Sequence, residues 1–330
     1  MAIGSGLGSS VGVVAEVTHG TYVAPTRFLP ALSFNVKKVQ NVAPVNGLAA
    51  GRSAPVDEVV TTTAATGQIK AQVLRANWGL MLAHLTGSAT TPVQQAATAA
   101  YLQTHAWTDN FGKSLTLQGG FPLASGTVVP KTATGCKITQ AEFSCAVDGI
   151  LEATFDFDGK TYTEAQSLAA PSYTASNAPF HFGEMGVKLG TFASEATVQG
   201  VRSVNLTIAR GQDVGRFYAG NSGAKSEQIW NEYAAISGTL EVDHVTAADF
   251  NDRYTGHTAT SLVWEFVGAT AIAMTHFPAI RFTMPKVYFG AGIDEVSDAG
   301  VIKASIPFNA FLDTTNGLLT ATYMSTDTAI

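Results

Sequence analysis

The stretch Leu32-Ser-Phe-Asn-Val36 carries apolar residues at alternate positions, and Val204-Asn-Leu-Thr-Ile208 repeats this pattern at an offset of 172 in the numbering. Thr66-Gly-Gln-Ile-Lys-Ala-Gln-Val73 returns as Ser237-Gly-Thr-Leu-Glu-Val-Asp-His244, at an offset of 171. Such alternation is typical of antiparallel strands with one buried and one wetter face. The nearly constant offset indicates that the chain contains two copies of one domain.

Each copy continues with a short helix that we expect to end at a glycine. The two helix ends, Leu85-Thr-Gly87 and Tyr254-Thr-Gly256, follow the same repeat at an offset of 169. In the second copy Thr246-Ala-Ala-Asp249 is similar to a capping box and predicts the start of the helix. The remainder of each copy is predicted to form strands, with turns at Asp148-Gly149 and near Asp298-Ala-Gly300. The predicted class is all-β with one short helix per domain.

The length of 330 residues suits two domains of about 150 residues each. We expect an N-terminal arm and first strand over residues 1–25, one domain over 26–168 and a second over 169–330. Charged residues make up 13% of the chain, against a usual fraction of about 25%. The low fraction suggests that neighbouring subunits cover much of the surface.

The net charge of −6 resides in the second half. Residues 1–170 carry ten basic and ten acidic residues, whereas residues 171–330 carry nine and fifteen. Proteins that grip nucleic acid need clustered Lys and Arg, which are absent here, so we expect no tight DNA binding. The first twenty residues lack a secretory signal pattern, and no apolar stretch reaches membrane-spanning length. Cys136 and Cys145 are expected to be buried free thiols, although their spacing also allows a disulfide bond between them.

Two long segments with little periodicity, Lys38–Thr66 and Ala209–Ser237, occupy the same position in the two copies. A compact domain rarely keeps an irregular loop of that length unless the loop has a function. We therefore expect both segments to contact a neighbouring subunit.

Sites for chemistry are not evident in the sequence. The seven histidines lack the spacing of a zinc site, and no catalytic or cofactor motif occurs in the structural context that it needs. We therefore predict no enzymatic activity, no metal and no cofactor.

One family resemblance covers nearly the whole chain. The Gly-rich start, Val11-Gly-Val-Val-Ala-Glu16 and Gly20-Thr-Tyr-Val-Ala-Pro-Thr-Arg-Phe28, followed by strand, long loop, strand, helix and further sheet, resembles the tail tube (major tail) proteins of long-tailed, non-contractile bacteriophages. The resemblance implies tandem β-sandwich or barrel domains whose sheets join into a ring-shaped inner β-barrel. With two domains per chain, three chains would make a pseudo-sixfold ring.

The resemblance also implies partners and a place. Rings would stack into a tube that conducts DNA to the host cell, in the tail of a virion whose proteins are made in the bacterial cytoplasm. The chain would contact itself, the tape measure protein and DNA in the lumen without specific binding, and the tail terminator and tail-tip proteins, with no membrane.

Two sets of residues follow from the resemblance by position. The long segments become inter-ring loops, with polar contacts from Arg52, Asp57, Glu58, Arg210, Arg216 and Glu227. The polar sides of the repeated strands become candidates for the lumen: Gln68, Lys70, Gln72, Thr239, Glu241 and Asp243.

Three alternatives differ in testable features. A tail-tip or baseplate ring protein of the same fold would form one ring and stop. A carbohydrate-binding adhesin should expose a cluster of aromatic residues, whereas Trp78, Trp107, Trp230 and Trp264 are spread along the sequence. An enzyme would need a convergent site that the sequence does not display.

Overall fold

The computed structural model describes residue 4 and residues 6–47, 51–88, 90–175, 177–243, 246, 248–292 and 301–330. The fold is all-β with one short α-helix in each half, as predicted. The strands of the first half are β1 (Ser10–Ala15), β2 (Arg27–Leu29), β3 (Ala31–Val45), β4 (Asp57–Gln72), β5 (Val93–Gln94), β6 (Tyr101–Ala106), β7 (Leu115–Pro122), β8 (Val128–Ala146), β9 (Glu152–Gly159) and β10 (Thr161–Thr163). Those of the second half are β11 (Met185–Thr191), β12 (Ser194–Thr197), β13 (Val201–Ala209), β14 (Gln212–Asp213), β15 (Ile229–Trp230), β16 (Ala235–Asp243), β17 (Thr260–Val267), β18 (Ala279–Phe289), β19 (Lys303–Ala310) and β20 (Thr320–Ser325).

Strand pairing follows the same plan in both halves. In the first half each strand pairs with the next in the order β1, β7, β8, β9, β4 and β3. In the second half the order is β11, β17, β18, β19, β16 and β13. All of these pairs are antiparallel. The sequence repeat is therefore also a repeat of topology.

The two halves align more closely in the structure than in the sequence pattern. Both repeated hairpins have a β-bulge, at Leu32 in β3 and at Arg202 in β13, which gives an offset of 170. On the partner strands Gly67, opposite Val36, and Gly238, opposite Leu206, give an offset of 171. The sequence alignment of Leu32 with Val204 is therefore out of register by two positions. A shift of two leaves the same side chains on the same face of the sheet.

One sheet connects the halves. The C-terminal part of β8 pairs with β9 on one side and with β13 of the second half on the other. A second connection is the pairing of β6 with β20. The buried side chains of both halves form one continuous cluster, in which Phe143 of β8 packs against Phe155 and Phe282, with ring centroids 5.8 and 4.7 Å apart.

Helix α1 (Gly79–Thr86) is buried along its whole length and ends at Gly87, whose φ of 82° is left-handed as the sequence predicts. Helix α2 (Asn251–Thr255) begins later than the capping-box pattern suggested. Its N-cap is Phe250, without a side-chain cap bond, so the prediction of a start at Thr246 was wrong. A single short 3₁₀ turn, η1 (Phe182–Glu184), precedes β11 among the described residues.

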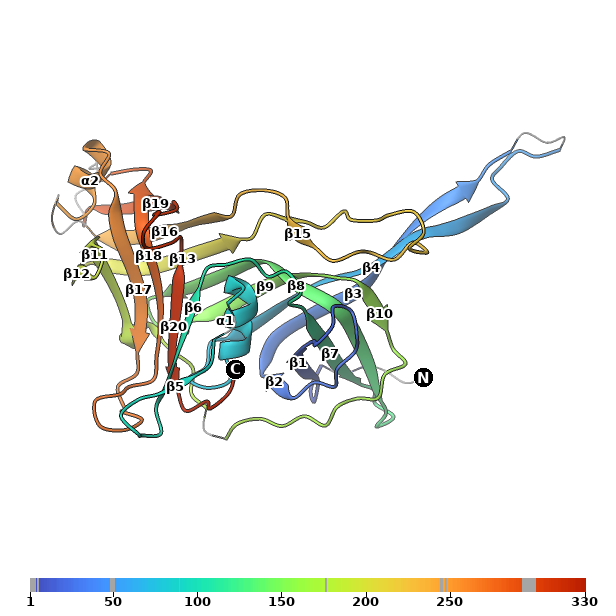
Figure 1. Ribbon diagram of the computed structural model, residues 1–330, viewed down its shortest axis with the longest axis horizontal. Coiled ribbons are helices and arrows are strands. Elements are labelled where there is room, and N and C mark those ends of the chain that lie inside the picture. Colours follow the sequence, from blue (N-terminus) through green and yellow to red (C-terminus); the bar gives the residue numbers. More distant parts are fainter. Residues whose placement is uncertain are drawn as a thin grey trace.

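The segment Lys38–Thr66 is a long β-hairpin, so the prediction of an irregular loop was wrong. Its paired strands run out to Val45 and Asp57. A bulge between Asn41 and Val42 interrupts the period of two, which explains why the sequence did not display it. Figure 1 shows this hairpin extending far beyond the rest of the molecule. We call its projecting part, residues 39–47 and 51–63, the arm.

The corresponding segment Ala209–Ser237 is irregular, as expected, except for the two-residue strands β14 and β15. It runs in the same direction as the arm but over the first half of the chain (Figure 1). The predicted turn at Asp148-Gly149 is present, with Gly149 N–H donating to Ala146 O at 2.9 Å. The turn predicted near Asp298 lies outside the described residues. Cys136 and Cys145 are buried free thiols, and burial raises the pKa of Cys145 to about 11.

Candidate assembly interfaces

One face of the continuous sheet is polar across seven strands. The register puts Asn35 of β3 beside Gln68 of β4. Gln68 lies beside Asp156 of β9, which lies beside Gln140 of β8. Across the junction Asn205 of β13 lies beside Thr239 of β16, and Glu241 of β16 lies beside Ser305 of β19. All six residues proposed from the sequence lie on this face: Gln68, Lys70, Gln72, Thr239, Glu241 and Asp243. The opposite face carries buried apolar residues such as Ile69, Phe155, Phe143, Leu206 and Leu240.

On the polar face, side chains of neighbouring strands form ion pairs and hydrogen bonds with one another. Lys70 Nζ lies 2.6 Å from Glu152 Oε2, and Gln68 Nε2 donates to Asp156 Oδ1 at 2.8 Å. In the second half Arg202 Nη1 lies 3.1 Å from Asp243 Oδ2. Carboxylates and cations are nearly balanced on this face. Glu142, Glu152, Asp156, Glu241 and Asp243 lie there with Lys37, Lys70, Arg202 and Lys303.

The outer edge of β3 is open. Within the described residues β3 pairs only with β4, whereas its counterpart β13 pairs with both β16 and β8. Beside this edge is a groove of about 1030 Å³, lined by Leu29 to Phe34 and by the β7–β8 turn region around Phe121 and Leu123. Leu32, at the bulge, is 52% exposed. An unpaired strand edge next to an apolar groove is a template for another strand.

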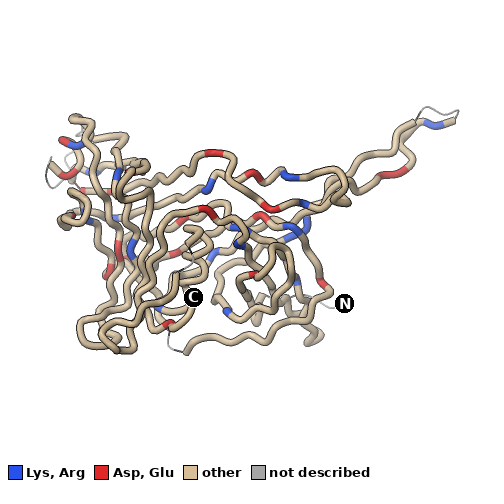
Figure 2. Tube along the Cα trace, in the orientation of Figure 1, with Lys and Arg blue, Asp and Glu red and all other residues tan. Residues whose placement is uncertain are grey.

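The arm carries apolar side chains without covering them. Val42 opposes Val60 on one face of the ribbon, and Val59 opposes Ala43 on the other. Val42, Val56, Val59 and Val60 are each about half exposed. Arg52, Asp57 and Glu58 are exposed near the end of the arm, and Figure 2 shows the stretch between them and the body without charge. An isolated two-stranded ribbon is marginally stable in water, so this arm needs a surface to rest on.

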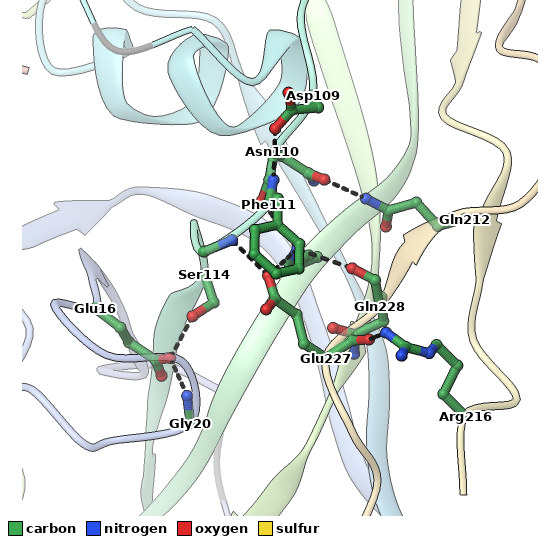
Figure 3. Close-up of polar contacts among 12 residues, drawn as sticks. Glu16, Gly20, Asp109, Asn110, Phe111, Ser114, Gln212, Arg216, Glu227 and Gln228 are labelled. Carbon is green, nitrogen blue, oxygen red and sulfur yellow. Dashed lines mark hydrogen bonds and ion pairs between the residues drawn. The ribbon is translucent and has the colours of Figure 1, made fainter.

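The second long segment is anchored to the first half by a buried polar cluster (Figure 3). The fully buried Lys137 donates to Asn110 O, Glu227 Oε1 and Gln228 O at 2.9, 2.6 and 2.9 Å. Burial lowers the pKa of Lys137, although Glu227 opposes the shift. Burial alone would raise the pKa of Glu227, but Lys137 and the N–H of Gly112 together lower it.

A second buried ion pair lies next to this cluster. Lys225 Nζ is 2.5 Å from Asp158 Oδ1, and Gln228 Nε2 donates to Asp158 Oδ2 at 2.6 Å. Burial raises the pKa of Asp158, and both donors oppose that shift. Nearby, the buried carboxylate of Glu16 accepts hydrogen bonds from Ser114, Thr116 and the N–H groups of Gly20 and Gly135. The Lys137 and Asp158 contacts hold the segment against the first half of the same chain.

Three residues assigned from the sequence to inter-ring contacts are therefore used inside the chain. Arg210 is completely buried and donates to Leu85 O and Thr108 O, which lie near the end of α1. Arg216 donates to Glu227 O at 2.5 Å, and Glu227 binds Lys137. The expectation of a surface contact was wrong for Arg210, because a guanidinium enclosed in this way cannot reach another molecule.

An aromatic cleft lies where the second segment returns to the sheet. The cleft has a volume of about 670 Å³ and is lined by Trp107, Trp230, Glu232, Tyr233, Ala234, Ala235, Ile236, Asn309, Ala310, Phe311, Leu312 and Leu318. Tyr233 is 99% exposed, and Phe311 and Leu312 are also exposed. Trp107 and Trp230 are distant in sequence but both stack near the Arg210 guanidinium, at 4.4 and 5.5 Å. The spread of tryptophans along the sequence thus did not reveal this pair.

Across the described part of the chain, no group of three His, Cys, Asp or Glu side chains is placed to hold a metal ion. Neither of the helices described above is long and apolar enough to cross a membrane.

Comparison with known proteins identifies a family for this chain. No curated protein matches the sequence. A family model described as "Phage tail tube protein" matches residues 6–310, which is most of the chain. The chain therefore belongs to the phage tail tube protein family.

Proposed function

We propose that three copies of this chain form a ring, and that such rings stack into the tube through which phage DNA passes. The family is one of structural proteins of the phage tail, which supports self-assembly and a place in the virion. In this proposal residues 26–168 and 169–330 are two tube domains, and each chain fills two of six positions. The observation that carries the proposal is the β8–β13 junction.

This junction supplies a rule for joining chains. Within one chain β13 receives β8 along the edge that faces away from β16. The counterpart edge on β3 is unpaired in the described residues. We propose that the second half of the next chain fills it, on its β18 side. Repeating one junction between unlike ends of identical chains gives a closed ring when the rotation closes.

The polar face supports a role as the wall of the channel. Closing the sheet around an axis leaves one face inward, and the other face must bury the apolar core. The proposed lining residues are those on the polar side of the repeated strands: Gln68, Lys70, Gln72, Thr239, Glu241 and Asp243. Lys70 and Arg202 on this face are paired with Glu152 and Asp243, so no cluster of free cations is proposed to hold phosphates, and DNA would slide rather than bind.

The arm is the element proposed to reach the adjacent ring. Arg52, Asp57 and Glu58 remain the candidate polar contacts, because they are exposed near its end. Arg210 is excluded by burial, while Arg216 and Glu227 are proposed to position the second segment. The tape measure protein in the lumen, a terminator at one end and tail-tip proteins at the other are the further partners proposed for the tube.

Assembly of the purified protein tests the proposal. Electron microscopy of negatively stained samples should show long tubes with a uniform ring repeat. Leu32→Asp should place a carboxylate at the proposed seam and leave folded, unassembled chains, whereas Val93→Asp, at a valine 60% exposed on β5, should assemble normally. Single rings that never elongate would instead support a tail-tip ring protein. A monomer under all conditions would refute the proposal.

A further inference from the structure

The contact between the second segment and the first half has a counterpart surface in the second half. The segment follows β13, and Gly223 O accepts from Thr63 N–H of β4 at 3.0 Å. It then binds Asp158 of β9 through Lys225 and Lys137 of β8 through Glu227. These three strands, β4, β9 and β8, correspond to β16, β19 and β18 of the second half.

The offsets identify the counterpart residues. Strand β9 (Glu152–Gly159) maps onto β19 (Lys303–Ala310) with an offset of 151, so Asp158 corresponds to Asn309. The pairs Ile138–Phe157 and Phe289–Phe308 give the same offset, so Lys137 corresponds to Tyr288. With the offset of 171 between Gly67 and Gly238, Thr63 corresponds to Ala234. Asn309 and Ala234 both line the aromatic cleft, and Tyr288 packs edge-on against its Phe311 at 5.5 Å.

We call the surface of the first half on which the second segment lies, formed by Thr63, Lys137 and Asp158, the seat. The aromatic cleft is the equivalent of the seat in the second half. The equivalent of that segment is the arm, because Lys38–Thr66 and Ala209–Ser237 connect the same pair of repeated strands. The connection from Val36 to Gly67 is one residue shorter than that from Leu206 to Gly238. The chain's own arm extends away from β16 and β19, which carry cleft residues Ala235, Ile236, Asn309 and Ala310 (Figure 1). Only the arm of another copy can therefore occupy the cleft in the same manner.

The contact is polar in the first half and apolar in the second, both on the segment and on the surface that it meets. In the first half a polar segment meets a polar seat, with Glu227 against Lys137 and Lys225 against Asp158. With the offset of 171, Glu227 corresponds to Val56 and Lys225 to Ala54, whereas the seat residues become Tyr288 and Asn309. An apolar arm therefore faces an apolar seat. Val56 is 57% exposed and Tyr233 is 99% exposed, so both surfaces lack a cover in the single chain.

We propose that the aromatic cleft of one chain holds the arm of the adjacent chain in the same ring, with Val56 and Val59 against Trp230, Tyr233 and Phe311. This inference rests on the proposed ring, in which β3 of one chain lies beside β18 of the next. The proposed contact, which we call the clasp, joins the arm to the adjacent chain of the same ring. The far end of the arm remains available for contact with the ring above. A cleft with two tryptophans also suits a sugar ring, and the test below separates the two occupants.

Photo-crosslinking of assembled full-length protein tests the contact. Val59 is replaced by benzoylphenylalanine, with the same replacement at Val93 as the matched control. Irradiated tubes should yield chain-to-chain products whose cross-linked peptides contain residues 230–236 or 309–312, and the Val93 control should yield none there. Normal tubes with cross-links mapped elsewhere, or a cleft that still binds oligosaccharide within those tubes, would overturn the clasp alone. Failure of the unmodified protein to form rings would overturn the proposed function and the clasp with it.

Transfer of the polar pair gives a second, independent measurement. Val56→Glu should raise the concentration needed for assembly by more than about tenfold, because it puts an unpaired carboxylate into an apolar cleft. Combining it with Tyr288→Lys recreates the pairing of Glu227 with Lys137 and should recover most of that loss. Val93→Glu should leave assembly unchanged. Equal loss in the single and double variants would contradict the proposed contact.

Discussion

Removing the carboxylate of Glu227 should destabilise the free chain strongly. Its partner Lys137 has a fully buried side chain and three acceptors, of which Glu227 is the only charged one among the described residues. Breaking a buried ion pair by removing one partner costs about 3–5 kcal/mol, because the remaining charge is left uncompensated. Glu227 is 17% exposed, and two carbonyl groups continue to accept from Lys137. We therefore expect Glu227→Gln to lower the free energy of unfolding by about 3 kcal/mol, at the lower end of the range.

The assay is urea unfolding of unassembled protein at neutral pH, followed by tryptophan fluorescence. Glu227→Gln is compared with Lys137→Met and with the double variant, which gives the coupling between the two residues. Lys70→Met is the matched control, because Lys70 and Glu152 are 42% and 32% exposed. Ion pairs exposed to this degree contribute about 0–1 kcal/mol. We expect a coupling of about 2 kcal/mol between Lys137 and Glu227.

A Glu227→Gln variant as stable as the Lys70→Met control would refute this reasoning. It would mean that the second segment is not held on the first half by the buried cluster. The comparison of this surface with the aromatic cleft, from which the arm contact was inferred, would then no longer hold.

Three further results are expected. Burial lowers the pKa of His84 from 6.5 to about 3, so the folded state resists protonation of this side chain. Stability against urea should be full at neutral pH and should fall as the solution is acidified below the pKa of His84 in the unfolded chain. His84→Leu should make the urea midpoint depend less on pH. Gly238→Ala should cost about 2 kcal/mol in unfolding experiments, as overpacking does, because its Cβ would lie 2.2 Å from Asn205 O, whereas Gly6→Ala, with no atom within 4 Å, should be neutral. Replacing residues 43–59 by an Asn-Gly turn should leave the melting temperature unchanged but abolish tube elongation in light-scattering assays; normal tubes from this variant would exclude a role of the arm in assembly.

Local patterns in the sequence accounted for the class of the fold and for the repeat. Alternation placed Gln68 and Thr239 on the face opposite Ile69 and Leu240, and the structure has the same division. Gly87 ended α1 as expected, because a left-handed residue is needed there. These features depend on neighbours within a few residues, which a single sequence can reveal.

The features that the sequence did not reveal depend on distant partners. The junction pairs β8 with β13 across a long stretch of intervening chain, and no periodicity specifies which edge a strand will meet. Arg210 was expected at an inter-ring contact because it lies in the second long segment. Its acceptors, Leu85 O and Thr108 O, belong to the first half of the chain. A bulge interrupts the alternation along the arm, so the sequence did not reveal its strands. The repeat also did not reveal that the seat is polar in the first half and apolar in the second.

The number of chains per ring tests the central claim most directly. Scanning transmission electron microscopy of unstained tubes gives mass per unit length, and power spectra of the same tubes give the ring spacing. We expect three times the chain mass of 34.4 kDa in each ring repeat. Six chains per repeat would contradict the account, because each chain would then fill one position and the β8–β13 junction would not be the template for the ring.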